Sequence, residues 1–258
     1  MCGVLLMAIK EERAGGYMKK KIIIGIMGFL AVSMMSGCSS SEYQYENVKE
    51  GELLELGHYH QETEAGKDFS PIEWYVLKKE NGQALLLSEY VLACVPYGDK
   101  EQEGEAFVGC VWRDSNLRRW LNEEFYEDAF TKEEQERILY TTNALYYDYE
   151  GNYTEYGEIS TEDKISLLNE EDYFAYVYGK DFSDASATPY LRSQDENFEE
   201  FDRDWELITP GMGESGNNAI VSEGEVYGTS APWWMADGVH YVNVRPAIWI
   251  KLDGYEKH

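Results

Sequence analysis

Cys38 is the residue whose surroundings indicate chemistry most clearly. Lysines at 19–21 are followed by an uncharged, mostly apolar run over 22–34, and two small residues, Ser36 and Gly37, stand directly before the cysteine. A basic start, a short apolar run and small residues are the parts of a secretory leader. This run is shorter than the roughly 18 to 20 apolar residues that a spanning helix needs.

The phrase MSGC at 35–38 resembles a bacterial lipobox, which directs diacylglycerol onto a cysteine thiol. The resemblance implies a leader over residues 1–37, with translation starting at Met18, and a Ser-rich tether over 38–48. Each buried CH₂ contributes about 0.8 kcal/mol, so several acyl chains would hold Cys38 firmly in a bilayer. We therefore expect an extracytoplasmic protein, lipid-anchored to the bacterial cell membrane. An ordinary signal peptide or an uncleaved anchor is the alternative.

Cys94 and Cys110 are the cysteines that follow this leader and tether. Outside the cytoplasm, an even pair of cysteines invites a disulfide. Closing the loop between them would contribute roughly 3 kcal/mol. Two separate buried thiols are the alternative, and two thiols are too few ligands for structural zinc.

Calcium is the one cofactor that the sequence gives a reason to consider. Asp148, Glu150 and Asn152 place oxygen donors at alternate positions of the phrase DYEGN. Carboxylate and amide oxygens are the ligands that Ca²⁺ prefers. The remaining spacing of an EF-hand loop is missing, so a plain solvated loop is the alternative.

The signals for catalysis are weak. His58 and His60 form a close histidine pair, but the chain contains neither an H-E-x-x-H nor a G-x-S-x-G phrase. Paired carboxylates could hydrolyse a glycosidic bond. The chain carries 49 acidic residues, however, so any chosen pair would be arbitrary. We expect no catalytic activity, and an envelope enzyme is the last of the alternatives.

The charge of the chain restricts its partners. Residues 1–37 hold five of the 22 basic and two of the 49 acidic side chains, so the remainder has 17 basic and 47 acidic ones. Nucleic acids and anionic lipid headgroups both attract clustered Lys and Arg. We therefore expect no nucleic-acid partner, and contact with the bilayer through the acylated cysteine alone.

Aromatic and arginine side chains are the candidate ligand contacts. Trp233 and Trp234 follow Ala-Pro in a loop-like setting and cannot both face one core, and an exposed tryptophan ring stacks well on a sugar. Trp205 and Arg245 are the other two candidate ligand contacts. The Arg245 guanidinium is planar and can donate two parallel hydrogen bonds to an anion. The structural alternative is that Arg245, like Arg118, braces carboxylates or loop carbonyls inside the fold.

These residues must be positioned by strands with one group of helices between them. Alternation predicts a β-hairpin over 71–92 that turns at Asn81-Gly82. Apolar residues at helical spacing predict two short helices over 115–139, with Ser115 as the first N-cap and a capping box from Thr131 to Glu134 as the second. We expect further strands over 52–58, 165–168, 205–208, 219–222, 225–227 and 242–250, a hairpin or loop over 143–163, a helix after Asn169, and irregular chain over 181–204. The class is therefore α+β.

Five phrases in this order carry a resemblance: PIEWYVL at 71–77, LLLSEYVL at 85–92, WRDSNLRRWLNEEFYEDAF at 112–130, LLNEEDYF at 167–174 and VNVRPAIWI at 242–250. Together they resemble the bacterial family of the domain of unknown function 6273, and they imply such a domain over 49–254. The family resembles C-type-lectin-like domains, which implies a twisted antiparallel sheet with two or three short helices on one side. Glu206 and Leu207 stand where the family usually has Leu and Arg, so this chain lacks the arginine of the family pattern at that position.

The resemblance implies a lectin-like binding module without catalysis, whose ligand is a glycan or an envelope protein. A structural or protein-interaction lipoprotein, using the Tyr-rich stretch 143–157, is the alternative function. Asn122 closes the first helix, and we expect its amide to tie down a neighbouring loop.

Overall fold

The computed structural model describes residues 45, 47–63, 69–98, 110–147, 157–194, 203–211, 218–227, 235–236 and 239–252. All of them belong to one compact unit, Ser40–His258. Three groups of predicted site residues lie outside the described residues: Cys38, the calcium ligands Asp148, Glu150 and Asn152, and the pair Trp233 and Trp234.

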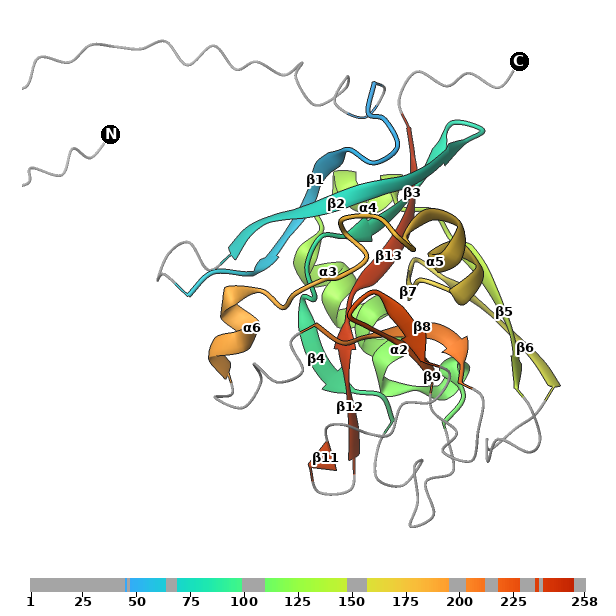
Figure 1. The fold of residues 1–258 in the computed structure, drawn as a ribbon. Coiled ribbons are helices and arrows are strands. Elements are labelled where there is room, and N and C mark those ends of the chain that lie inside the picture. The colour runs from blue at the N-terminus through green and yellow to red at the C-terminus, as the bar shows by residue number, and fades with distance from the viewer. Residues whose placement is uncertain are drawn as a thin grey trace, which may run out of the picture. The chain divides into compact units, whose positions relative to one another are not determined.

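Five antiparallel strands form the main sheet, in the order β1-β2-β3-β13-β7 (Figure 1). They are β1 (Leu53–His60), β2 (Phe69–Glu80), β3 (Gln83–Ser88), β13 (Pro246–Lys251) and β7 (Ile165–Leu167). The predicted hairpin is confirmed. β2 and β3 are joined at Asn81 and Gly82, whose φ angles of 50° and 74° lie in the left-handed region that these two residue types tolerate.

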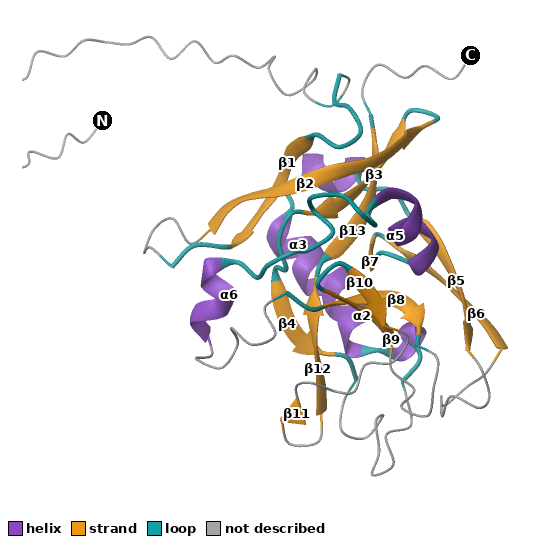
Figure 2. Cartoon of the chain, viewed as in Figure 1, coloured by secondary structure: helices purple, strands orange, loops and turns teal. Residues whose placement is uncertain are grey.

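Three smaller antiparallel sheets surround the main one (Figure 2). They comprise β4 (Ala93–Pro96) with β12 (Val239–Val244) and β11 (Met235–Ala236); β8 (Trp205–Pro210) with β9 (Asn218–Ser222) and β10 (Glu225–Tyr227); and the hairpin of β5 (Thr141–Tyr147) and β6 (Gly157–Asp163). The fold is therefore α+β and mostly antiparallel, as predicted.

The predicted final strand over 242–250 is in fact two strands in two sheets. β12 pairs with β4, whereas β13 pairs with β3 and β7. The chain changes sheets at Arg245, whose side chain is fully buried and donates to the backbone oxygens of Ser88 and Phe182. Pro246 follows and has no N–H to continue the first ladder. The apolar pattern runs through this break because both strands are buried.

The helices begin where the capping residues predict. The segment over 116–129 is one continuous helix: α2 (Asn116–Trp120), a π-helical turn η2 (Leu121–Phe125) and α3 (Tyr126–Ala129); before it lies the 3₁₀ turn η1 (Trp112–Asp114). Ser115 Oγ accepts from the backbone N–H of Arg118 at 3.0 Å. The capping box of Thr131 and Glu134 starts α4 (Lys132–Arg137), and Asn169 caps α5 (Glu170–Tyr176).

One helix was missed. α6 (Pro189–Gln194) lies in the segment 181–204 that we expected to be irregular. Thr188 Oγ1 accepts from the backbone N–H of Leu191 at 3.2 Å, and proline stands at the first helical position. Both are start signals that the sequence displays.

The main sheet is buried on both faces. In β3, Ala84 and Leu86 belong to one hydrophobic cluster, and Leu85 and Leu87 belong to the other. The helix over 116–129 packs into the first cluster, and α5 packs into the second through Tyr173. The expectation that the helices lie on one side of the sheet therefore holds for the first helix but not for α5.

Candidate functional site

The side chains of the 112–130 motif meet at one buried carboxylate, Asp163. Trp112 Nε1 donates to its Oδ2 at 2.9 Å, and Arg118 Nε donates to its Oδ1 at 2.6 Å. Asn143 and Thr161 also donate to Oδ2, at 2.8 and 2.6 Å. Asp163 is 1% exposed, so these donors replace the water that the carboxylate loses. The cluster braces the first helix against the β5–β6 hairpin.

Arg118 and Asn122 have the structural roles that we expected, although Asn122 lies inside the helix over 116–129 and does not close it. Arg118 Nη1 also donates to the backbone oxygen of Arg113 at 3.2 Å. Asn122 Nδ2 donates to the backbone oxygens of Arg118 and Ile165 at 3.0 and 2.9 Å. Its Oδ1 accepts from the backbone N–H groups of Lys164 and Ile165 at 2.8 and 3.0 Å. The amide thus ties the start of β7 to the helix.

Arg245 and Trp205, two of the predicted ligand contacts, are core residues. Their side chains are 0% and 1% exposed, and the guanidinium carbon of Arg245 lies 4.9 Å from the centroid of the Trp205 ring. Burial lowers the pKa of Arg245 to about 9. Because both side chains are covered by protein, neither can meet a ligand at the surface. Arg245 instead has the structural role of the alternative, because its guanidinium donates hydrogen bonds to the backbone oxygens of Ser88 and Phe182.

Glu206 and His240 form a second buried polar pair. His240 Nε2 lies 3.7 Å from Glu206 Oε1, and the residues are 6% and 4% exposed. Burial raises the pKa of Glu206 well above its usual range and lowers that of His240 to about 4. Burial thus favours the uncharged form of each group. The pair is closed off from solvent, and among the described residues no three His, Cys, Asp or Glu side chains gather as a metal site.

Cys94 and Cys110 are not joined in a disulfide in the structure, and only Cys110 is buried, whereas the second alternative expected two buried thiols. The two residues belong to different hydrophobic clusters. Cys94 packs against the cluster of α5 and β8, whereas Cys110 is buried in the cluster of the first helix. Neighbouring Ala93 and Val95 face the Cys110 side, so alternation along β4 turns Cys94 away from it.

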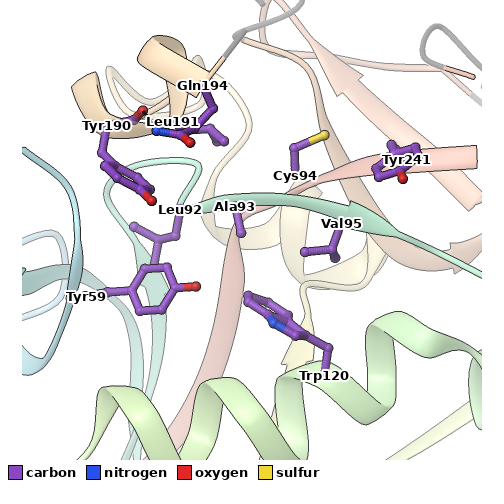
Figure 3. Close-up of a pocket in the computed structure, with 10 residues that line it drawn as sticks. All are labelled: Tyr59, Leu92, Ala93, Cys94, Val95, Trp120, Tyr190, Leu191, Gln194 and Tyr241. Carbon is purple, nitrogen blue, oxygen red and sulfur yellow. Dashed lines mark hydrogen bonds between the residues drawn. The ribbon is translucent and has the colours of Figure 1, made fainter. Parts of the chain in front are cut away.

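A cavity of about 340 Å³ lies where β1, the first helix, β4, α6 and β12 come together (Figure 3). Its aromatic lining consists of Tyr59, Trp120, Tyr190 and Tyr241, and its other lining residues are Leu92, Ala93, Cys94, Val95, Leu191 and Gln194. Figure 3 shows the α6 side chains on one side of β4 and the rings of Tyr59 and Trp120 on the other.

Ring contacts hold the aromatic wall of the cavity in place. The centroid of Tyr59 lies 4.9 Å from that of Phe125, and the centroid of Trp120 lies 5.2 Å from the same ring. Tyr190 stacks on His60 at 5.2 Å. Burial raises the pKa of Tyr59 to about 12, so its hydroxyl stays protonated and can donate a hydrogen bond. The wall is therefore preformed.

The chemistry of the cavity is that of an uncharged binding pocket. Among the described residues that line it, none carries a charge at neutral pH. Polar groups are supplied by the tyrosine hydroxyls, the Gln194 amide and the Cys94 thiol. Such a lining can hold an amphipathic ligand, with apolar faces against the rings and polar groups toward the hydroxyls and the amide.

Comparison with known families matches residues 81–252 to the domain of unknown function DUF6273. The chain belongs to the DUF6273 family. The match covers two thirds of the chain, whereas the structure shows that β1 and β2, which precede it, are part of the same sheet. No curated protein and no solved structure matches the chain. Within the described residues, no helix has the length and apolar character to cross a membrane.

Sequence reasoning about the DUF6273 domain did not predict this cavity. Trp120 stands at helical spacing with Leu117 and Leu121, which favours a core position, yet its side chain is only partly buried. Tyr59, Tyr190 and Tyr241 are spread over more than half the chain, and α6, which carries Tyr190, was not expected. The abundance of tyrosine, at 21 residues, was the one available signal.

Proposed function

We propose that this protein is a lipid-anchored, extracytoplasmic binding protein whose lectin-like DUF6273 domain holds an uncharged glycan and catalyses no reaction. The aromatic cavity carries the proposal. The leader and lipobox-like phrase before Cys38 support the anchor. A mostly antiparallel sheet with short helices is compatible with a C-type-lectin-like fold.

The lining of the cavity favours a sugar. A pyranose ring has faces of C–H groups, which pack on tyrosine and tryptophan rings, and a rim of hydroxyls, which need donors and acceptors. Tyr59 and Trp120 offer ring surface, and Gln194 is an exposed amide at the rim. The cavity volume of about 340 Å³ lies within the roughly 300 to 1,000 Å³ that is typical of small-molecule pockets.

The charge of the protein favours a neutral sugar over an acidic one. The chain has a formal net charge of −27, which repels anions at long range. The described cavity lining offers no Lys or Arg to compensate a carboxylate that leaves water. Neutral hexoses and amino sugars whose nitrogen is acetylated are therefore the preferred class.

A glycan array probed with the purified domain tests the proposal, with Tyr190→Ala as the site variant and Tyr146→Ala as the matched control. Tyr146 is 73% exposed on β5 and does not line the cavity. Loss of the stacked ring at Tyr190 costs about 1.4 kcal/mol, which is roughly tenfold in Kd for a neutral glycan. Because the described lining contains no carboxylate, binding should survive a calcium chelator. Equal affinities for the two variants, or binding of acidic glycans only, would contradict the proposal.

The anchor has its own test. Mass spectrometry of the protein extracted from membranes should show an N-terminal peptide that begins at Cys38 and carries diacylglycerol. An unmodified sulfur, or a product that keeps the leader, would exclude the lipid anchor while leaving the cavity unaffected.

A protein partner is the second candidate, and one observation favours it. Phe174 and Tyr178 on and just after α5 are 48% and 46% exposed, with ring centroids 5.4 Å apart. Exposed neighbouring aromatics are enriched at protein interfaces. A Phe174→Ser variant that loses an envelope protein retained by the wild type, while keeping glycan binding, would favour this function.

A further inference from the structure

The segment that precedes β1 already packs against the folded domain. Tyr45 and Val48 are 6% and 8% exposed, and both belong to the hydrophobic cluster that the first helix covers. We assigned these positions to a tether over 38–48. The structure instead makes Tyr45 and residues 47–52, called the strap below, part of the folded domain.

Tyr45 is the outermost attachment of the strap. Its hydroxyl donates to the backbone oxygen of Glu55 on β1 at 3.3 Å. The guanidinium carbon of Arg137, the last residue of α4, lies 5.0 Å from the centroid of the Tyr45 ring. A cation over an aromatic face is attractive, and the ring itself is removed from water.

The remainder of the strap is held by β2. Lys79 Nζ donates to the backbone oxygen of Val48 at 2.6 Å, and the Lys79 backbone N–H donates to Glu50 Oε1 at 2.8 Å. Two backbone hydrogen bonds join Gly51 and Glu52 to Val76, at 2.7 and 3.0 Å. Figure 1 shows this segment, in blue, beside the β2–β3 end of the main sheet.

The attachment at Tyr45 decides how far the domain can lie from an anchored cysteine. Seven peptide units separate Cys38 from Tyr45, and at about 3.5 Å each they span at most about 25 Å. If the chain were attached only from Leu53 onward, fifteen units would span up to about 50 Å. A domain of this size has a diameter of about 45 Å. The longer leash exceeds this diameter, whereas the shorter one is little more than half of it. Only the shorter leash therefore confines Tyr45 to the half of the domain that is nearer the membrane.

We infer that the surface around Tyr45, formed by the strap, the Glu55 region of β1 and the end of α4, lies in the half of the domain that is nearer the lipid bilayer. The inference rests on the proposed anchor at Cys38. The strap holds Tyr45 within about 25 Å of the bilayer surface, which is little more than half of the domain's diameter, so Tyr45 cannot lie on the side that points away. Ligands reach the domain from the side that faces away from the membrane or along its flanks.

Two measurements on full-length protein test this inference. Trypsin cleavage after Lys49 reports the docking of the strap and does not depend on lipidation. Lys49 has an exposed side chain, but the protease needs several extended residues on either side of it, and these are bonded to β2. We expect Tyr45→Ala to be cut at least about tenfold faster than the wild type, because cleavage follows the population of the detached strap. Lys79→Met should show a smaller increase, and the control Tyr146→Ala should show none.

Neutron reflectometry of the lipidated protein on a supported bilayer then measures the height of the domain. Tyr45→Ala should raise or broaden the protein layer by about 10 Å if Val48 and the residues after it stay bonded to β2, and by up to about 25 Å if the whole strap detaches. If the protein is not lipidated, no protein layer forms on the bilayer. The trypsin assay does not need lipidation and still measures whether the strap is bound to the domain. Equal cleavage rates, or equal layer heights for two proteins that both bind the bilayer, would overturn the inference. Near-ultraviolet circular dichroism of each variant verifies that the domain stays folded.

Discussion

Replacing Asp163 with alanine should remove the acceptor that four side chains share. Trp112 Nε1 is left buried without a partner, because Trp112 is 1% exposed. An unsatisfied buried donor costs about 1 to 3 kcal/mol. Arg118 keeps two backbone acceptors, but its charge loses a buried carboxylate at 2.6 Å. Breaking such a pair typically costs about 3 to 5 kcal/mol in total, and we expect Asp163→Ala to destabilise the domain by that amount.

Urea unfolding followed by tryptophan fluorescence measures this loss. The matched control is Asp184→Ala, because Asp184 also pairs with an arginine, Arg203 at 3.2 Å, but in an exposed setting. The control should change the free energy of unfolding by less than about 0.5 kcal/mol. Asp163→Asn keeps one acceptor oxygen and should fall between the two. If Asp163→Ala were no more destabilising than Asp184→Ala, the motif residues would not act as a brace, and our structural interpretation of them would fail.

Three further predictions concern the folded core. Glu206→Gln should stabilise the domain relative to the wild type increasingly as the pH rises above about 4.5, because the unfolded wild type loses the Glu206 proton there while burial makes the folded protein keep it. Urea unfolding at about pH 5 and about pH 8 would show a constant difference if this were wrong. Gly57→Ala should cost about 3 kcal/mol or more in the same assay, since φ is 73° there and a Cβ would lie 2.7 Å from the Phe130 ring, so a loss of under about 1 kcal/mol would contradict the packing. Cys94 and Cys110 should both react with an alkylating reagent in denaturant without prior reduction, and a requirement for reductant in mass spectrometry would show a disulfide instead.

Local signals in the sequence determined much of the secondary structure. The Asn81-Gly82 turn, the Ser115 cap and the capping box at Thr131 each depend on residues within four positions of one another, so their geometry can be read without knowing the fold. The α+β class followed from the same periodicities. α6 was missed although Thr188 and Pro189 displayed a start signal, because an acidic segment around them suggested irregular chain.

The sequence by itself thus determined the hairpin, the helices of the motif and the family. Only the tertiary structure decided which candidate residues are accessible. Trp205 and Arg245 look like ligand contacts by residue type, yet packing places both in the core. Tyr59, Trp120 and Tyr190 line one cavity only when β1, the first helix and α6 meet. The physical reason is that residue type and local spacing govern short-range hydrogen bonds, whereas exposure and cavities depend on contacts between segments far apart in the chain.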